Sequence, residues 1–131
     1  GSQAVPNGRN AAANIVGTWL VTYTSNGSPF GQAFIQWHDD FTEWENVNFP
    51  ISSGNICVGA WKSVDPSHVR RLHYGWLYTD GSLTGYFIET ETDHLLHRNT
   101  YSGFNHSTIY DLSGNILATV SGTSSAVRIA P

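Results

Sequence analysis

Three side chains in the middle of the sequence have the chemistry needed for general acid–base catalysis. His73, Glu45 and Glu89 each lie within a different stretch that is rich in Val, Ile, Thr and aromatic residues. A carboxyl group that is desolvated among tryptophans has a raised pKa and serves as a general acid or base near neutral pH. We therefore predict that His73 acts with Glu45 or Glu89. The alternative is that His73 is an ordinary core or interface histidine and that both glutamates are solvated.

The histidines and the single cysteine do not form a recognisable metal-binding motif. Of the six histidines only His94 and His97 are close in sequence, and no HxH or HExxH arrangement occurs. Cys57 is the only cysteine and is typical of a small buried apolar residue. The sequence thus predicts neither a metal site nor a cofactor.

The elements that must position these residues are short strands. Gly, Asn, Asp, Ser and Pro separate eight stretches of strand-forming residues, and Asp80-Gly81 is typical of a two-residue hairpin. The segment 93–98 has the only spacing that suits a turn of helix. The predicted strands are residues 15–25, 30–38, 42–49, 55–63, 68–79, 82–92, 98–112 and 115–130.

Short connections restrict how these strands pair. Parallel crossovers need a dozen residues or more, so hairpin-length loops favour an antiparallel meander. A flat meander would leave two bare edges, and closure removes both of them. The predicted fold is all-β: an eight-stranded antiparallel up-and-down barrel without substantial helix, over residues 15–131. Residues 1–14 are interpreted as a tag remnant, Gly1-Ser2, followed by a flexible extension.

Two distant positions carry a family resemblance. Gly17-Thr18-Trp19 opens the first predicted strand, and Arg128 lies near the end of the last one. The pair resembles the calycin superfamily of lipocalin-like barrels, in which an arginine packs across the Gly-x-Trp tryptophan. The resemblance implies that Trp19 and Arg128 close one end of the barrel. It identifies no subfamily, and it transfers no ligand-binding residue to this chain.

Alternation along the strands predicts which residues line the lumen, since every second side chain of a barrel strand points inward. Aromatic rings with polar tips suit ligands that contain rings. The predicted strand 68–79 is partly apolar on both faces, so one of its faces is also a candidate subunit contact in a homo-oligomer. The predicted ligand-binding residues are Tyr23, Phe34, His38, Trp44, Cys57, Trp61, Trp76 and Tyr86.

Composition narrows the class of partner. The chain has 131 residues, 6 basic and 10 acidic side chains and a formal charge of −4, without a basic cluster. This balance argues against nucleic acid and against an anionic membrane surface as partners. Scarce Lys and Glu beside abundant Ser, Thr, Asn and Gly favour a secreted or periplasmic protein, although the compartment stays unknown.

Three functions fit this sequence. The first is a small barrel that binds an apolar or aromatic small molecule in its lumen. The second is a cofactor-independent enzyme of the isomerase, cyclase, hydratase or lyase type that uses an inward His/Glu pair in the same cavity. The third is an oligomeric interaction protein with a packed lumen. A lumen with titratable groups would distinguish the second from the other two.

Overall fold

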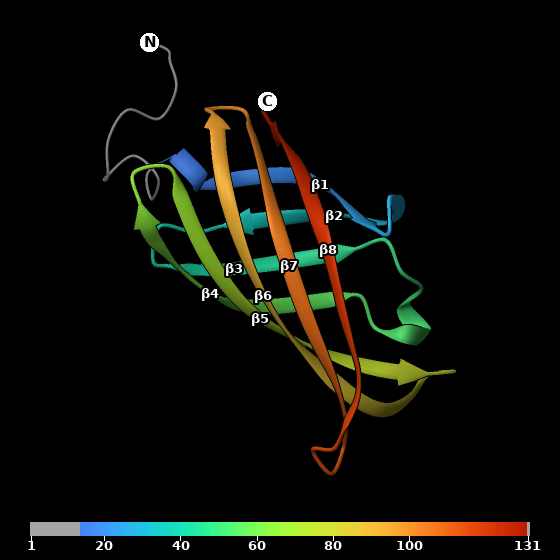
Figure 1. The fold of residues 1–131 in the computed structure, drawn as a ribbon. Helices are drawn as coiled ribbons and strands as arrows, with labels where there is room; N and C mark the ends of the chain where they lie inside the picture. Colours follow the sequence, from blue (N-terminus) through green and yellow to red (C-terminus); the bar gives the residue numbers. More distant parts are fainter. Residues whose placement is uncertain (1–13, 131) are drawn as a thin grey trace.

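A computed structural model describes residues 14–130 of the chain, and eight strands account for most of them (Figure 1). A single 3-10 turn, η1 (Ile51–Ser53), lies between the third and fourth strands. The strands are β1 (Gly17–Ser25), β2 (Ser28–Trp37), β3 (Thr42–Val47), β4 (Ile56–Asp65), β5 (His68–Thr79), β6 (Ser82–His97), β7 (Thr100–Asp111) and β8 (Ile116–Ile129).

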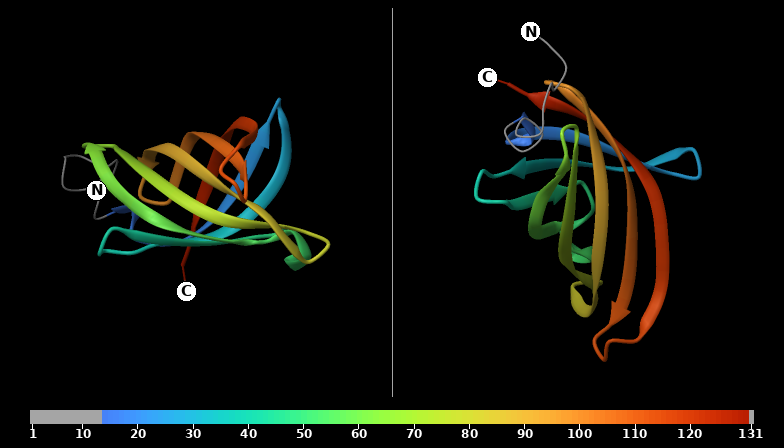
Figure 2. Two further views of the ribbon diagram at one scale, coloured as in Figure 1. Left: turned by 90° about the horizontal axis from the view of Figure 1, so that it is seen from below. Right: turned by 60° about the vertical axis from the view of Figure 1, so that its left-hand side comes forward.

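The strands form one closed barrel in which each strand pairs antiparallel with its neighbour in the sequence. Pairing between β1 and β8 completes the ring, with Trp19 opposite Arg128. Figure 2 shows the long β5–β8 strands curving around the shorter β1–β4 strands. The all-β, eight-stranded up-and-down barrel predicted from the sequence is therefore confirmed.

Local sequence explains the tight turns. Asn26-Gly27 and Asp80-Gly81 both have positive φ at their two central residues, 52° and 79°, and 50° and 83°. A two-residue turn with positive φ at both central residues has a backbone twist that matches the twist of the flanking strands. The segment 93–98 differs from its predicted helical turn, because β6 continues to His97. Asp93 and Leu95 alternate into the buried interior there, and the strand pairs with β5 and β7.

Apolar side chains fill one end of the barrel. Trp19 packs edge-on against Tyr101, with ring centroids 4.8 Å apart, and Arg128 stacks over Trp19 at 4.3 Å. The Arg128 guanidinium also donates to the carbonyls of Asn14, Val16 and Arg98. The buried apolar core consists of Ile15, Trp19, Val21, Tyr23, Ala33, Ile35, Trp37, Val47, Trp61, Val69, Leu95, Tyr101 and Ala126.

The predicted extension, residues 1–14, lies outside the described residues except for Asn14. Among residues 14–130, no helix has the length and apolar character needed to cross a membrane.

Candidate functional site

Strand register places acidic and basic side chains in the middle of the barrel. Glu43 of β3, Gly59 of β4, His73 of β5 and Glu89 of β6 lie in one row across four strands. Gly59 has no side chain, and a Cβ there would lie against the Leu72 carbonyl oxygen and 2.6 Å from the His73 Cα. The glycine thus allows Glu43 to reach His73 across β4.

Arg71 is the central cation of this cluster and is completely buried. Its Nη2 lies 3.0 Å from Glu89 Oε1 and 3.1 Å from Glu91 Oε1, and its Nη1 lies 3.8 Å from Glu43 Oε2. Burial alone would lower the pKa of Arg71, but Glu91, Tyr23 and Glu89 raise it well above the ordinary value. Arg71 therefore stays charged and uses its donors within the protein.

His73 is held between two carboxylates. Its Nδ1 lies 3.0 Å from Glu43 Oε1 and its Nε2 lies 2.8 Å from Glu89 Oε1. Burial and the nearby Arg71 lower the pKa of His73, but Glu89 and Glu43 outweigh both and raise it to about 9. Although burial acts against ionisation, Arg71 and His73 lower the pKa of Glu89 to about 2. The His73 imidazolium and the Glu89 carboxylate consequently form a charged pair at neutral pH.

Glu45 has a different environment from Glu89. It accepts a short hydrogen bond from the Tyr23 hydroxyl, which in turn accepts one of 2.9 Å from Arg71. Burial raises the pKa of Glu45, and burial also raises the pKa of Tyr23 and of the neighbouring Cys57 thiol. Of the two carboxyl groups Glu45 and Glu89, Glu45 is thus the one suited to gain and lose a proton at higher pH.

A second acidic group lies deeper in the barrel. Asp93 is fully buried next to Glu91, and burial followed by the Glu91 charge raises the pKa of Asp93 well above its ordinary value. Asn105 donates to Glu91 over 3.3 Å. Gly103 leaves space for the Asp93 carboxyl, which a Cβ at that position would contact. Because its pKa is raised, Asp93 keeps its proton to higher pH, and this lowers the charge buried beneath the cavity.

The open half of the barrel holds a cavity of about 550 Å³. Glu45, His73 and Glu89 line its inner end, together with Tyr23 and Cys57. Its walls are largely apolar and include Phe30, Val47, Phe49, Phe87, Ile109, Leu117 and Val120. An apolar pocket therefore ends on a layer of titratable groups.

The predicted site residues divide into several groups in the structure. His73, Glu45 and Glu89 come together at the cavity, as do Tyr23 and Cys57. Trp61 instead packs in the core, 5.7 Å from Trp37, and its indole donates to the His38 and Thr42 carbonyls.

Four predicted ligand residues face outward. Phe34 and Trp44 are 53% and 37% exposed on the outer faces of β2 and β3, opposite in direction to Ile35 and Glu45. His38 follows β2 and lies at the exposed turn, 3.1 Å from Thr42 Oγ1. Tyr86 lies on the outer face of β6 and does not line the cavity. Polar and aromatic residues occur on both faces of β2 and β3, so alternation alone does not show which face points inward; the buried Glu43, Glu45 and Trp37 show it.

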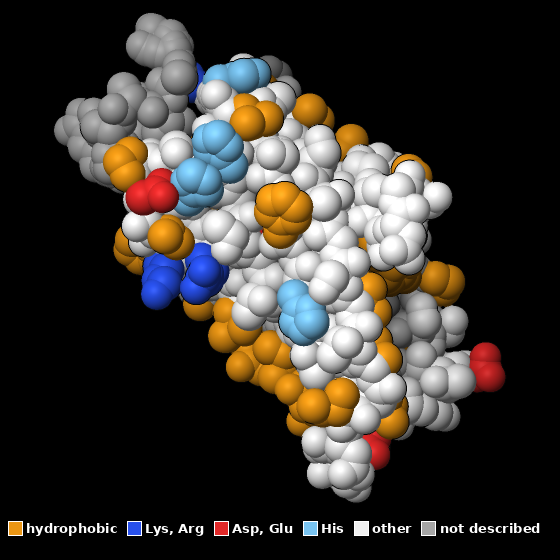
Figure 3. All heavy atoms as spheres, in the orientation of Figure 1, with side chains coloured by type: hydrophobic (Ala, Val, Ile, Leu, Met, Phe, Trp, Pro, Cys, Tyr) orange, Lys and Arg blue, Asp and Glu red, His pale blue; other side chains and the backbone are white. Residues whose placement is uncertain are grey.

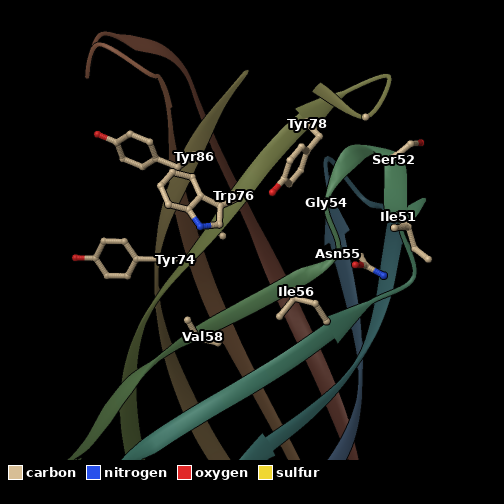
Figure 4. A pocket seen from close by; sticks show the side chains of 12 residues that line it. Ile51, Ser52, Gly54, Asn55, Ile56, Val58, Tyr74, Trp76, Tyr78 and Tyr86 are labelled. Atoms are coloured by element: carbon tan, nitrogen blue, oxygen red, sulfur yellow. The ribbon is translucent and has the colours of Figure 1, made fainter. Parts of the chain in front are cut away.

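Trp76 and Tyr86 belong mainly to a groove on the outside of the barrel. The groove has a volume of about 830 Å³ and lies between η1 and strands β4–β6. Figure 4 shows Tyr74, Trp76 and Tyr86 projecting from the barrel beside Ile56 and Val58. Trp76 is 59% exposed and also touches the rim of the inner cavity. Figure 3 shows exposed apolar side chains gathered along one edge of the molecule, and the homo-oligomer inferred from such faces stays a prediction.

The sequence interpretation missed Arg71, Glu43, Glu91 and Asp93. A signal was present in β6, where acidic residues alternate with threonines from Ile88 to Asp93. Threonine suits the solvent face of a strand, so the alternation placed Glu89, Glu91 and Asp93 together on the inner face.

One group of potential metal ligands exists among residues 14–130. Atoms of Glu45, Cys57 and His73 lie within 4.8 Å of one another. Both nitrogens of His73, however, are at hydrogen-bond distance from carboxylates. A bound metal would displace one of these pairs, since both nitrogens of His73 already lie against carboxylates.

The chain matches no protein-family model, and comparisons with curated proteins and with solved structures also found no match.

Proposed function

We propose that this protein is a cofactor-independent enzyme of the isomerase or cyclase type, which binds a small, mostly apolar molecule in the barrel and transfers a proton through Glu45. One observation carries the proposal: an apolar cavity ends on a buried carboxyl group whose pKa burial raises. A carboxylate in such surroundings is a stronger base than one in water, and its acid form returns the proton to the product. An isomerisation of this kind is balanced without an oxidant or reductant.

The neighbouring residues have distinct parts in this proposal. The Tyr23 hydroxyl donates a hydrogen bond to Glu45 and so orients the carboxyl group. Arg71, which does not line the cavity, donates to Tyr23 and positions it. His73 and Glu89 form a charged pair beside Glu45. We regard Glu45 as the catalytic residue and Tyr23 and Arg71 as positioning residues.

Binding without chemistry is the second candidate, and the apolar walls of the cavity favour it. Both candidates fit a lipocalin-like barrel, and the Trp19–Arg128 stack supports that finer family resemblance. The fold hosts binders and enzymes alike, so a test of Glu45 must decide between them.

Ring opening of nitrobenzisoxazole tests for an accessible base. The base removes the ring C–H proton, the N–O bond breaks with its electron pair moving to oxygen, and a coloured cyanonitrophenolate forms; the proton then passes from Glu45 to water. We expect turnover that rises with pH through an apparent pKa above 4.5, the ordinary value for Glu. Glu45→Gln should lower the rate about 100-fold or more. The control Asn46→Ala, on the same strand, should leave it unchanged.

The proposal is overturned if the wild-type protein shows no rate above that of buffer, or if Glu45→Gln retains the wild-type rate. Unchanged affinity for a bound aromatic ligand in the inactive Glu45→Gln variant would show that the loss is chemical, because binding would then be intact.

A further inference from the structure

Carboxyl groups outnumber cationic groups inside the barrel. Among the described residues five carboxyl groups are buried there, and only two cationic groups accompany them. The carboxyl groups are Glu43, Glu45, Glu89, Glu91 and Asp93, and the cations are Arg71 and His73. Buried charge is costly unless it is paired, so the interior favours any group that brings positive charge.

The cationic hydrogen-bond donors at the inner end of the cavity are already paired within the protein. Arg71 donates to Tyr23 and is paired with Glu89 and Glu91. Each His73 ring nitrogen lies against a carboxylate. A ligand that only accepts hydrogen bonds would therefore find few donors at the inner end of the cavity.

Acceptors, by contrast, face the cavity. Glu45 of β3 and Glu89 of β6 both line it, and a carboxylate accepts several hydrogen bonds. Ser107 donates to Glu89 Oε2 over 3.2 Å, which holds that carboxylate in place. The aromatic rings of Phe30 and Phe49 in the walls suit a cation as well as an apolar body.

From this arrangement we propose that the ligand of the cavity carries a protonated nitrogen, an amine or an imine, which binds against Glu45 and Glu89 while its apolar part contacts the walls. The inference rests on the proposed function and names its substrate class. Carboxylic acids are excluded from this class, because a third carboxylate would be placed against Glu45 and Glu89 without a free donor.

Three probes with the same ring system separate charge from shape: naphthalenemethylamine, naphthalenemethanol and naphthoic acid. We expect isothermal titration of the wild-type protein at neutral pH to show that the amine binds roughly 10- to 100-fold more tightly than the alcohol, the usual gain from a hydrogen bond between charged groups. The acid should bind most weakly. Because the comparison uses the wild-type protein, it does not depend on the folding of any variant.

Variants then locate the nitrogen. Glu45→Gln should remove most of the advantage of the amine over the alcohol while leaving the affinity for the alcohol within about threefold. Asp39→Asn, which removes an exposed carboxylate at a turn, should leave the amine affinity unchanged. Glu89→Gln is a second test of the same kind if the variant folds.

The possible results have separate meanings. Tighter binding of the alcohol or the acid would overturn the nitrogen inference, and base catalysis by Glu45 would still stand if nitrobenzisoxazole is turned over. Failure of all three probes to bind would overturn both the inference and the proposed use of the cavity. Stoichiometric Zn²⁺ binding that excludes the amine and is lost in Cys57→Ser would replace the inference with a metal site.

Discussion

Replacing the central Arg71 by methionine is the sharpest test of the charge cluster. Methionine keeps the length and apolar stem of the side chain but removes the guanidinium, which lies 3.0 Å from Glu89 and 3.1 Å from Glu91. Removing one partner of a buried ion pair costs about 3–5 kcal/mol, since the other charge stays buried and unpaired. Domains are typically stable by about 5–15 kcal/mol, so the loss should be a large part of the total.

The assay is chemical and thermal denaturation of Arg71→Met beside Arg70→Met, a matched control on the same strand. Arg70 is exposed and makes one hydrogen bond, of 3.3 Å to Thr92 Oγ1, so we expect its replacement to cost less than about 1 kcal/mol. For a chain of this length a loss of about 3–5 kcal/mol should lower Tm by roughly 10–20 °C. If Arg71→Met fails to fold, Arg71→Lys compared with Arg70→Lys tests the same ranking.

The pH dependence gives a second check. In the wild-type protein, the contribution of Glu89 to the free energy of unfolding is complete above its ordinary pKa of 4.5, and it is lost as the pH falls toward about 2. In Arg71→Met the pKa of Glu89 should rise. Protonation of Glu89 at low pH then removes a buried negative charge that has lost its cationic partner. The difference between wild type and Arg71→Met should narrow toward low pH. A difference that stays constant with pH, or one no larger than in the Arg70 control, would refute the cluster's assigned energetics.

Three further outcomes are expected. His73 contributes stability that is complete below its ordinary pKa of 6.5 and is lost as the pH rises through about 9, so wild-type denaturation midpoints should fall over that range by the equivalent of roughly 2–3 kcal/mol. In His73→Gln this fall should be absent; the same fall in both proteins would contradict the assignment. Gly59→Ala should destabilise the barrel by more than Gly81→Ala, because a Cβ at Gly59 meets backbone, whereas one at Gly81 meets nothing within 4 Å and is disfavoured only by the positive φ of 83°; equal urea midpoints would count against the packing argument. Arg128→Lys should cost about 1–2 kcal/mol, since lysine cannot stack on Trp19 and reach three carbonyls together, and unchanged unfolding followed by tryptophan fluorescence would contradict this.

The order of the strands was predictable because local chemistry specifies it. Asp80-Gly81 requires a tight hairpin, and the strand-forming stretches have too few residues between them for crossovers. Strand ends were less predictable. β6 extends to His97 because it continues to pair with β5 as far as His94 and with β7 as far as His97, and the local sequence of 93–98 does not show this pairing.

The candidate site was predictable only in part. His73, Glu45 and Glu89 could be predicted because each is an ionisable residue within a stretch of strand-forming residues. Arg71 was missed because it follows Arg70 directly: only one of two adjacent residues in a strand faces inward, and the sequence does not show which one. Trp76 is among the predicted ligand-binding residues, whereas Gly75 is the inward residue at that point of β5. Orientation was thus decided by the neighbouring strands, whose register is a property of the folded barrel.

The charged cluster and the apolar core that stabilises the fold occupy different parts of the barrel. At the closed end, Trp19, Trp37 and Tyr101 pack in the apolar manner that stabilises a small barrel. The charged residues are confined to the boundary between this core and the cavity, and they include the side chains that the cavity exposes. Apolar residues of similar volume would stabilise that boundary as well or better. A barrel that needed only to fold would gain nothing from five carboxyl groups around two cations, whereas a barrel that binds a cation and moves protons needs a surplus of acceptors at the end of its cavity.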